Sequence, residues 1–329
     1  MIIYTAINVT PMVEATPQPT KQISSSESHS PQDQTLLHIL RIQTEAIKAI
    51  HDYLYDRGLV QMMPVLLSPI TDPLNHDTLD AKIPYYDQEL QLTKSMIFHK
   101  QMAIAKTHAK GIYIMSPNVR LETSDKQDSG RHLIEFTQVD IELRGASRAD
   151  FMELMEGLII SVFIRVQRTC VEALGYLGVT IRIPESPFRI YSSEELRSLY
   201  GEDFESHASL LAHDPFWITD YSREFYDKED PARPGHYLNY DLFYPYGFNE
   251  ALSGGERDYE YDILVRKIKE RHQSIVPFEY FLEKARAGVL VPSAGGGLGI
   301  ERLVRFLTKQ PHIRNIAVFS RVPGEKIEF

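Results

Sequence analysis

Two charged, strand-like stretches, Asn118–Glu122 (NVRLE) and Ile134–Leu143 (IEFTQVDIEL), decide the fold of this chain. Side chains alternate between the two faces of a strand, so Arg120 and Glu122 share a face of the first stretch. In the second stretch, one face holds Phe136, Gln138, Asp140 and Glu142. So many charged groups are costly to bury unless they pair or bind a ligand. The pattern therefore leaves two interpretations: a solvent-exposed sheet face, or the floor of a pocket for a charged substrate.

Further strand-like runs surround these stretches, with helices inserted singly between them. The runs are Gln61–Leu67, Gly111–Met115, Leu238–Tyr244, Asn249–Ser253 and Leu290–Ser293. A helix capped by Ser30 stops at Gly58, and a second, capped by Ser147, ends at Gly175. Leu298–Thr308 is predicted as a final core helix. This order predicts the α+β class, with an antiparallel β-sheet flanked by helices.

The composition is that of one ordinary globular domain behind a short tail. Of the 329 residues, 43% are hydrophobic and 24% are charged. Residues 1–32 are polar and rich in Ser and Pro, so we predict a disordered N-terminal tail, with one folded domain over 33–329. No apolar run approaches the roughly 18 residues of a membrane span, and the start of the chain does not resemble a signal peptide. We therefore expect a cytoplasmic protein.

Charge and cysteine content exclude other classes. With 35 basic and 45 acidic residues, the formal net charge is −10, whereas proteins that mainly grip phosphate backbones usually carry a basic excess. This disfavours a dedicated nucleic-acid module. Cys170 is the single cysteine, which excludes an internal disulfide and a cysteine-based zinc site.

Two later stretches could carry chemistry, although each also has a plain structural interpretation. Asp241 and Glu250 flank a hairpin and are hard oxygen ligands of the kind that Mg²⁺ prefers, but an acidic hairpin alone would look the same. Glycines over 295–299 lead into the final helix, where backbone N–H groups could contact phosphate, but glycine-rich packing would also explain them.

The order and spacing of these stretches resemble the class II aminoacyl-tRNA synthetases of the aspartyl, asparaginyl and lysyl subclass. Arg120-Leu-Glu122 followed by EFTQVDIE is similar to motif 2, and Gly297-Leu-Gly299-Ile-Glu301-Arg302 is similar to motif 3. Residues 33–69 look like motif 1, the helix and strand through which these enzymes form homodimers. Within this group, the whole-chain pattern most resembles archaeal asparagine synthetases related to asparaginyl-tRNA synthetase. The resemblance implies the class II catalytic fold over 33–329.

The resemblance also implies an ATP site. Arg120 would contact the α-phosphate and Arg302 the γ-phosphate and adenine, and both count as catalytic residues. Phe136 would stack on adenine, Glu122 would hold its amino group, and Arg131 and His132 would close over the phosphates. Asp241 and Glu250 match the acidic pair that carries Mg²⁺ in this family. The implied cofactors are ATP and Mg²⁺.

An amino-acid site follows from the same resemblance. Lys100, within Ser95–Gln101 (SMIFHKQ), and Arg257 match the two cations that take the side-chain carboxylate of aspartate. Two such cations would be left unpaired by a neutral side chain, so they point to an acidic substrate. Ile97 departs from the family pattern, which has Gln there. The residues expected to orient the substrate are Gln138, Asp140, Ser253 and, in a lid over 69–84, Asp72.

From these features we expect ATP-dependent synthesis of asparagine from aspartate and ammonia, through a β-aspartyl-adenylate, with release of AMP and pyrophosphate. Only about 30 residues precede the core, which leaves no anticodon-binding domain, so tRNA is not expected as a partner. Cys170 on an apolar helix stripe is unsuited to glutamine hydrolysis, which favours free ammonia. Two alternatives remain: a paralogue that activates aspartate or another amino acid for transfer to tRNA or protein, and an inactive regulatory paralogue.

Overall fold

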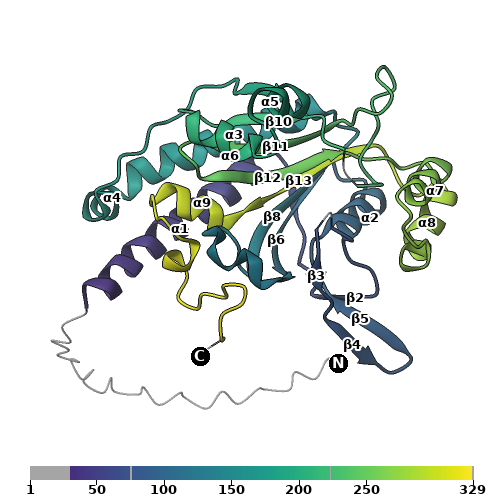
Figure 1. Cartoon of the computed structure of the whole chain (residues 1–329), viewed down its shortest axis with the longest axis horizontal. Coiled ribbons are helices and arrows are strands. Elements are labelled where there is room, and N and C mark those ends of the chain that lie inside the picture. Colours follow the sequence, from purple (N-terminus) through teal and green to yellow (C-terminus); the bar gives the residue numbers. More distant parts are fainter. Residues whose placement is uncertain (1–29, 75, 223, 328–329) are drawn as a thin grey trace, which may run out of the picture.

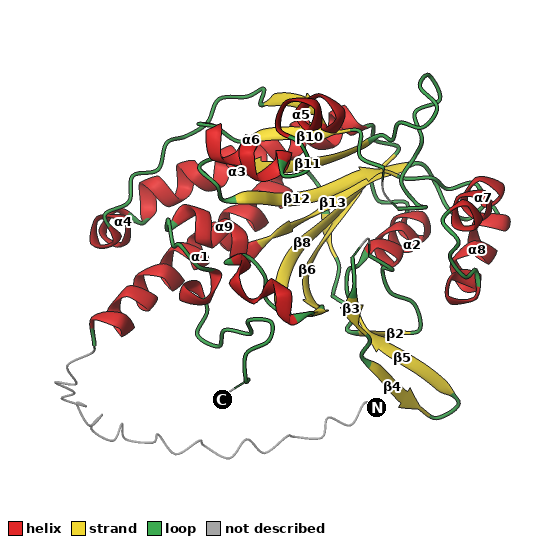
Figure 2. Ribbon diagram, in the orientation of Figure 1, coloured by secondary structure: helices red, strands yellow, loops and turns green. Residues whose placement is uncertain are grey.

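A computed structural model describes residues 30–74, 76–222 and 224–327 of the chain. Its centre is an eight-stranded sheet in the order β1-β6-β8-β13-β12-β11-β10-β9, drawn as the fan of strands in Figure 2. The β1–β6 and β9–β10 pairs at the two edges are parallel, and the other neighbours are antiparallel. The strands are β1 (Val60–Gln61), β6 (Gly111–Val119), β8 (Glu135–Arg144), β9 (Arg189–Ser192), β10 (Phe216–Thr219), β11 (Asn239–Tyr244), β12 (Asn249–Glu256) and β13 (Ser293–Gly299). The predicted α+β class with an antiparallel sheet is confirmed.

One face of the sheet is covered by three helices. These are α1 (Pro31–Asp56), α3 (Arg148–Thr169) and α9 (Ile300–Leu307), which lie together on one side of the molecule in Figure 1. Val139 and Ile141 of β8 point into the core beneath them, and both are fully buried. Because side chains alternate along a strand, Gln138, Asp140 and Glu142 must face the other way, toward the functional site.

Both long helices begin where the sequence predicts. Ser30 accepts from the backbone N–H of Asp33, and Ser147 accepts from that of Asp150, with the aspartates returning the bond in each case. The predicted end of the second helix was wrong. The helix α3 stops at Thr169, and the apolar stripe continues through buried Cys170 into a separate helix, α4 (Val171–Leu177).

The opposite face of the sheet carries α2 (Ile97–Thr107), which packs on β6 and β8. A helical pair, α7 (Tyr261–Glu270) and α8 (Glu279–Arg286), lies beyond α2 at one end of the sheet in Figure 1. A second apolar cluster joins Phe98 of α2 to Phe281 of α8 and to Phe225. Two further helices, α5 (Ser193–Tyr200) and α6 (Phe204–Leu211), contribute to a third cluster with β10 and β11. These layers leave the middle of the sheet, around β8, β12 and β13, facing a cavity.

Two strand predictions were wrong. The run Gln61–Leu67 is mostly irregular, with strands only at β1 and at β2 (Leu67–Ser68). The run Leu290–Ser293 ends where β13 begins, and the glycines expected before a helix form the strand itself. The smaller strands are β3 (Thr78–Leu79), β4 (Lys82–Tyr85), β5 (Gln88–Leu92) and β7 (Leu121–Glu122), which pair as β2-β5-β4 and β3-β7.

The predicted tail, residues 1–32, lies outside the described residues except for its last three, which cap and open α1. Among the described helices, none has the length and apolar character required to span a bilayer.

Candidate active site

A cavity of about 350 Å³ lies on the face of the sheet opposite α1 and α3, and a smaller one of about 40 Å³ adjoins it. The two cavities share Arg120, Glu122, Gln138 and Arg302 among their lining residues. The larger cavity brings together most of the sequence-predicted residues: Asp72, Lys100, Arg120, Glu122, Arg131, His132, Gln138, Asp140, Glu250, Ser253, Arg257 and Arg302. Phe136 lines the smaller one. The alternative of a solvent-exposed sheet face is therefore wrong.

Glycines in β13 make room for the cavity floor. A Cβ added at Gly295 would overlap the carboxylate of Glu142 and the carbonyl of Ile141 on the neighbouring strand. One added at Gly297 would press on Gln138 and on the Asp140 carboxylate, the latter at 3.2 Å. The glycines thus allow charged side chains of β8 to lie across β13, which explains a strand with so little β-propensity.

The small cavity and the adjoining end of the large one are built around two arginines. Arg120 donates from Nε to the carbonyl of Lys94 at 2.9 Å, and its guanidinium carbon lies 5.1 Å from the centre of the Phe136 ring. Arg302, on α9, pairs through Nη1 with Glu250 Oε1 at 3.1 Å and also donates to the Glu250 carbonyl. The two guanidinium groups and the Phe136 ring are therefore held in one place by β6–β8, β12 and α9.

The electrostatics of this end favour an anion. The pKa of His132 is lowered to about 3 by burial and by the neighbouring charges of Arg302 and Arg131, so His132 is neutral at physiological pH. Burial alone would raise the pKa of Glu122, but the hydrogen bond and charge of His76 and the charge of Arg120 lower it overall. His76 Nε2 lies 3.1 Å from Glu122 Oε1. A positive end with an ionised carboxylate beside an aromatic ring suits a nucleotide.

Glu301 opens α9 and ties it to β8. Both of its carboxylate oxygens accept from the backbone N–H of Thr137, at 2.9 and 3.0 Å. Burial raises its pKa to about 7, against the lowering effect of those hydrogen bonds and of Arg302. The carboxylate therefore spans the two elements that carry Phe136 and Arg302.

This raised pKa predicts a pH dependence of stability. Because the folded-state pKa (about 7) lies above the model-compound value of 4.5, the stabilisation due to Glu301 is fully present below pH 4.5 and is lost as pH rises through 7. Glu301→Gln removes this dependence. We expect the free energy of unfolding of the variant minus that of wild type to be more positive at about pH 8 than at about pH 5, because only wild type loses this stabilisation as pH rises. Urea unfolding of both proteins at both pH values measures this difference. The same difference between variant and wild type at both pH values would contradict a raised pKa of Glu301.

The other end of the large cavity holds the two predicted cations, Lys100 and Arg257, and both are buried and already paired. Lys100 Nζ lies 3.0 Å from Asp140 Oδ1 and 3.7 Å from Glu142 Oε2. Arg257 Nε lies 3.2 Å from Glu142 Oε1, and its Nη1 lies 3.5 Å from Asp227 Oδ1. Three protein carboxylates already pair with these cations, so a neutral substrate side chain would not leave them unpaired, and their binding of an aspartate carboxylate stays a prediction. Charge alone does not identify an acidic substrate.

Two carboxylates at this end are placed to bind hydrogen-bond donors. Asp140 Oδ2 is buried and has no hydrogen-bond partner within the described residues. Asp72 accepts from the Ser95 hydroxyl at 2.8 Å and from the Tyr226 hydroxyl at 3.0 Å, which fixes it in the segment between β2 and β3. An unpaired buried carboxylate oxygen is costly, so a ligand with N–H groups is expected to meet it.

One predicted site residue, Asp241, is not among the lining residues of either cavity. Asp241 is buried in β11 opposite Ser253. A register shift between Leu242 and Phe243 makes Phe243 the partner of Glu250. Asp241 therefore lies two residues along β11 from the position opposite Glu250, on the same face of the sheet, and the metal-binding role of the two carboxylates stays a prediction. No cluster of three or more potential metal ligands occurs within the described ranges.

Several residues of the site were missed in the sequence. Glu142 was visible, since it shares a strand face with Asp140. The others come from the loop after β2, from α6 and from the segment between β10 and β11, where no motif was recognised. They are His76, Glu205, Glu224, Tyr226 and Asp227, all of which line the large cavity.

Comparisons with known proteins agree with this geometry. The family described as tRNA synthetases class II (D, K and N) matches residues 29–323. The aspartate–tRNA(Asp/Asn) ligase of Methanopyrus kandleri is 30% identical over 94% of this chain and 78% of its own length. The asparagine–tRNA ligase of Pyrococcus abyssi is 30% identical over 87% and 68%, respectively. The crystal structure of asparaginyl-tRNA synthetase from Pyrococcus horikoshii complexed with asparaginyl-adenylate superposes with a TM-score of 0.80, at 26% identity, covering 90% of this chain and 71% of that one.

These relatives correct two expectations. Ammonia-dependent synthesis of asparagine is wrong as the function, because the relatives are tRNA ligases. The expectation that tRNA is not a partner conflicts with the same relatives. It rested partly on net charge, which averages over the whole surface and does not report a local binding face.

Proposed function

Because this chain belongs to the class II tRNA synthetases of the D, K and N group, we propose that it activates aspartate with ATP and transfers it to tRNA. It is a ligase of that family. We propose aspartate as the amino-acid substrate, tRNA as the acceptor, and ATP with a divalent metal ion as the source of activation.

One observation carries the proposal. A single cavity is lined by Arg120 and Arg302, which also line the small adjoining cavity, and by Lys100 and Arg257, which do not. Gln138 and Asp140 of β8 line the same cavity. ATP at the arginine end and an amino acid at the other would meet over β8, with the carboxylate of the amino acid near the α-phosphate.

The first step is adenylate formation. An oxygen of the α-carboxylate of aspartate attacks the α-phosphorus of ATP, and pyrophosphate leaves with the electron pair of the broken P–O bond. Arg120 would stabilise the charge that builds on the α-phosphoryl oxygens, because its planar guanidinium is permanently charged and held in place by the Lys94 carbonyl. Arg302 would bind the departing phosphates, and Phe136 would stack on adenine.

The second step is transfer to tRNA. A ribose hydroxyl at the 3′ end of tRNA attacks the activated carbonyl, the C–O bond to the phosphate breaks, and AMP leaves with that oxygen. Activation already supplies a mixed anhydride, so the chain needs no nucleophile of its own. This agrees with Cys170, which is buried in the apolar core and whose thiol pKa is raised by burial.

A divalent cation fits this cavity through Glu250. Mg²⁺ usually keeps several waters and takes one or two carboxylates plus substrate phosphates, so it does not require a cluster of protein ligands. Glu250 lines both cavities beside Arg302. When bound, the ion would supply charge neutralisation for the phosphates.

Asparagine is the second candidate substrate, and the ion pairs favour it. Lys100 and Arg257 are engaged by Asp140, Glu142 and Asp227. The free Oδ2 of Asp140 would accept an N–H from a carboxamide or an ammonium group. An aspartate side chain would instead have to share its cations with these carboxylates.

An exchange assay separates these candidates. Purified protein is incubated with ATP, Mg²⁺, labelled pyrophosphate and one of aspartate, asparagine or lysine, and label entering ATP is counted. We expect aspartate-dependent exchange. Exchange with asparagine alone would select the second candidate, and no exchange with any amino acid would contradict amino-acid activation. Transfer is then scored as acid-precipitable labelled amino acid in the presence of tRNA.

A further inference from the structure

Lys267, on α7, is a fully buried lysine that lines neither cavity of the active site. Its ammonium group donates to the backbone carbonyl of Asp227 and to the Asp258 carboxylate, the latter at 2.7 Å. A charge is rarely buried unless it is paired. Both partners of this charge belong to segments that carry active-site residues.

These two segments are joined at Asp227 and Arg257, which line the large cavity. Asp227 and Arg257 form an antiparallel bridge, and the backbone N–H of Asp258 donates to the carbonyl of Tyr226 at 2.9 Å. Lys267 holds one segment by its backbone and the other by the carboxylate next to Arg257. It therefore fastens Asp227 and Arg257 to each other and to α7 from behind the cavity wall.

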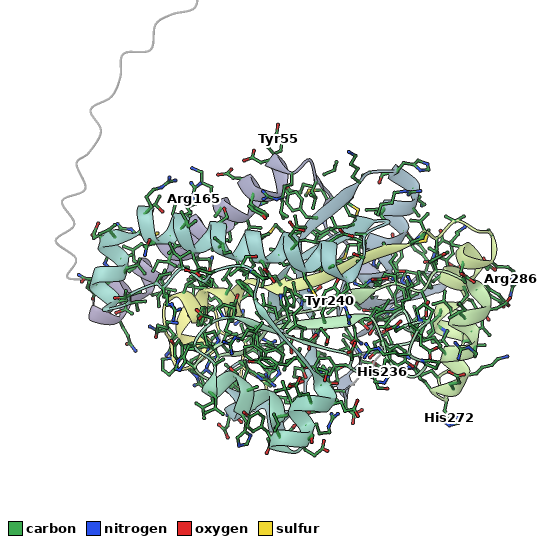
Figure 3. The ribbon with its side chains drawn as sticks, turned by 90° about the horizontal axis from the view of Figure 1, so that it is seen from above. Tyr55, Arg165, His236, Tyr240, His272 and Arg286 are labelled. Carbon is green, nitrogen blue, oxygen red and sulfur yellow. The ribbon has the colours of Figure 1, made fainter. Side chains whose placement is uncertain are left out.

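The helical pair α7–α8 is itself anchored to the rest of the amino-acid end. Phe281 of α8 packs on Phe98 of α2, with ring centres 4.8 Å apart, and Phe98 lies two residues before Lys100 on the same helix. Phe225 and Tyr226 belong to the same apolar cluster. In Figure 3 the labelled residues His272 and Arg286 mark this pair at the margin of the molecule, and Arg165 lies well away from it on α3.

We infer that Lys267 is a positioning residue for the amino-acid end of the site: it sets the place of Arg257 and Asp227 without touching substrate. The inference rests on the proposed function, because its readout is binding of the amino acid. Geometry carries it, since Lys267 contacts the two segments at the positions adjacent to the lining residues. A buried ion pair with a purely structural role would affect the stability of the fold but would not change KM for the amino acid relative to KM for ATP.

The test compares two variants of Lys267 in the exchange assay. Lys267→Met removes the charge and all donors, whereas Lys267→Gln keeps an N–H for the Asp227 carbonyl. We expect KM for the amino acid that supports exchange to rise about ten-fold or more in Lys267→Met, with KM for ATP within about two-fold. For Lys267→Gln, KM for the amino acid should lie between the values for wild type and Lys267→Met. This variant provides the same measurement if Lys267→Met does not fold.

The matched control is Arg165→Met. Arg165 also joins two elements by ion pairs, to Glu45 at 2.7 Å and Asp52 at 2.8 Å, but on the far helical layer. Its loss should leave both KM values unchanged. Equal rises of KM for ATP and the amino acid in the Lys267 variants, or no change in either, would overturn the inference. If wild type shows no exchange with any amino acid, the proposed function fails instead.

Discussion

Arg120→Ala should lower amino-acid-dependent ATP–pyrophosphate exchange by about 10²–10³-fold, which is typical of losing one group that stabilises transition-state charge. Arg120 is fixed by the Lys94 carbonyl and lies beside the Phe136 ring, so its guanidinium cannot be replaced by a neighbour without movement. Arg120→Lys keeps the charge but loses the planar fork, and we expect intermediate activity. The measurement is the exchange rate at saturating ATP.

The control for this prediction is Arg182→Ala. Arg182 pairs with Asp214 at 3.1 Å on an exposed surface and lines neither active-site cavity. It should retain wild-type exchange. Full exchange activity in Arg120→Ala would contradict the proposal that Arg120 stabilises charge on the α-phosphate of ATP.

Gly295→Ala should abolish exchange and destabilise the fold. The added Cβ would overlap the Glu142 carboxylate and the Ile141 carbonyl, and neither can move freely in the middle of a sheet. Overpacking a core costs about 1–3 kcal/mol. Breaking a buried ion pair costs about 3–5 kcal/mol, and a displaced Glu142 would break its pair with Arg257. The free energy of unfolding in urea and the exchange rate together measure this effect.

Gly175→Ala is the matched control for that substitution. Gly175 lies in α4, and an added Cβ there meets nothing within 4 Å. Alanine is the better helix former, so stability should stay the same or rise by up to about 1 kcal/mol. Wild-type stability and exchange in Gly295→Ala would show that the glycines of β13 have another role.

Much of the site could be predicted because its residues lie on contiguous, alternating strand positions. Arg120, Glu122, Gln138 and Asp140 face one cavity, as the period of two in β7 and β8 requires. Charge on one strand face, with apolar residues on the other, distinguishes a pocket floor from a core. The family resemblance then assigned the partners on β12 and α9.

The other features of the site depend on contacts between residues that are far apart in the sequence, and the spacing of motifs does not predict such contacts. The register shift between β11 and β12, which makes Phe243 the partner of Glu250, is not visible in the spacing of Asp241 and Glu250. The glycines of β13 have no β-propensity, and only the side chains that cross them explain the strand. Asp227 and Glu142 are far apart in the sequence, so nothing in the sequence shows that both carboxylates pair with Arg257.

The most direct test of the account follows oxygen from the amino acid into AMP. Aspartate labelled with ¹⁸O in its carboxylates is incubated with the protein, ATP, Mg²⁺ and tRNA, and the nucleotide products are analysed by mass spectrometry. Attack of the carboxylate on the α-phosphorus, followed by cleavage of the C–O bond on transfer, predicts one ¹⁸O atom in each AMP released. Unlabelled AMP, or formation of ADP in its place, would contradict amino-acid activation at this cavity.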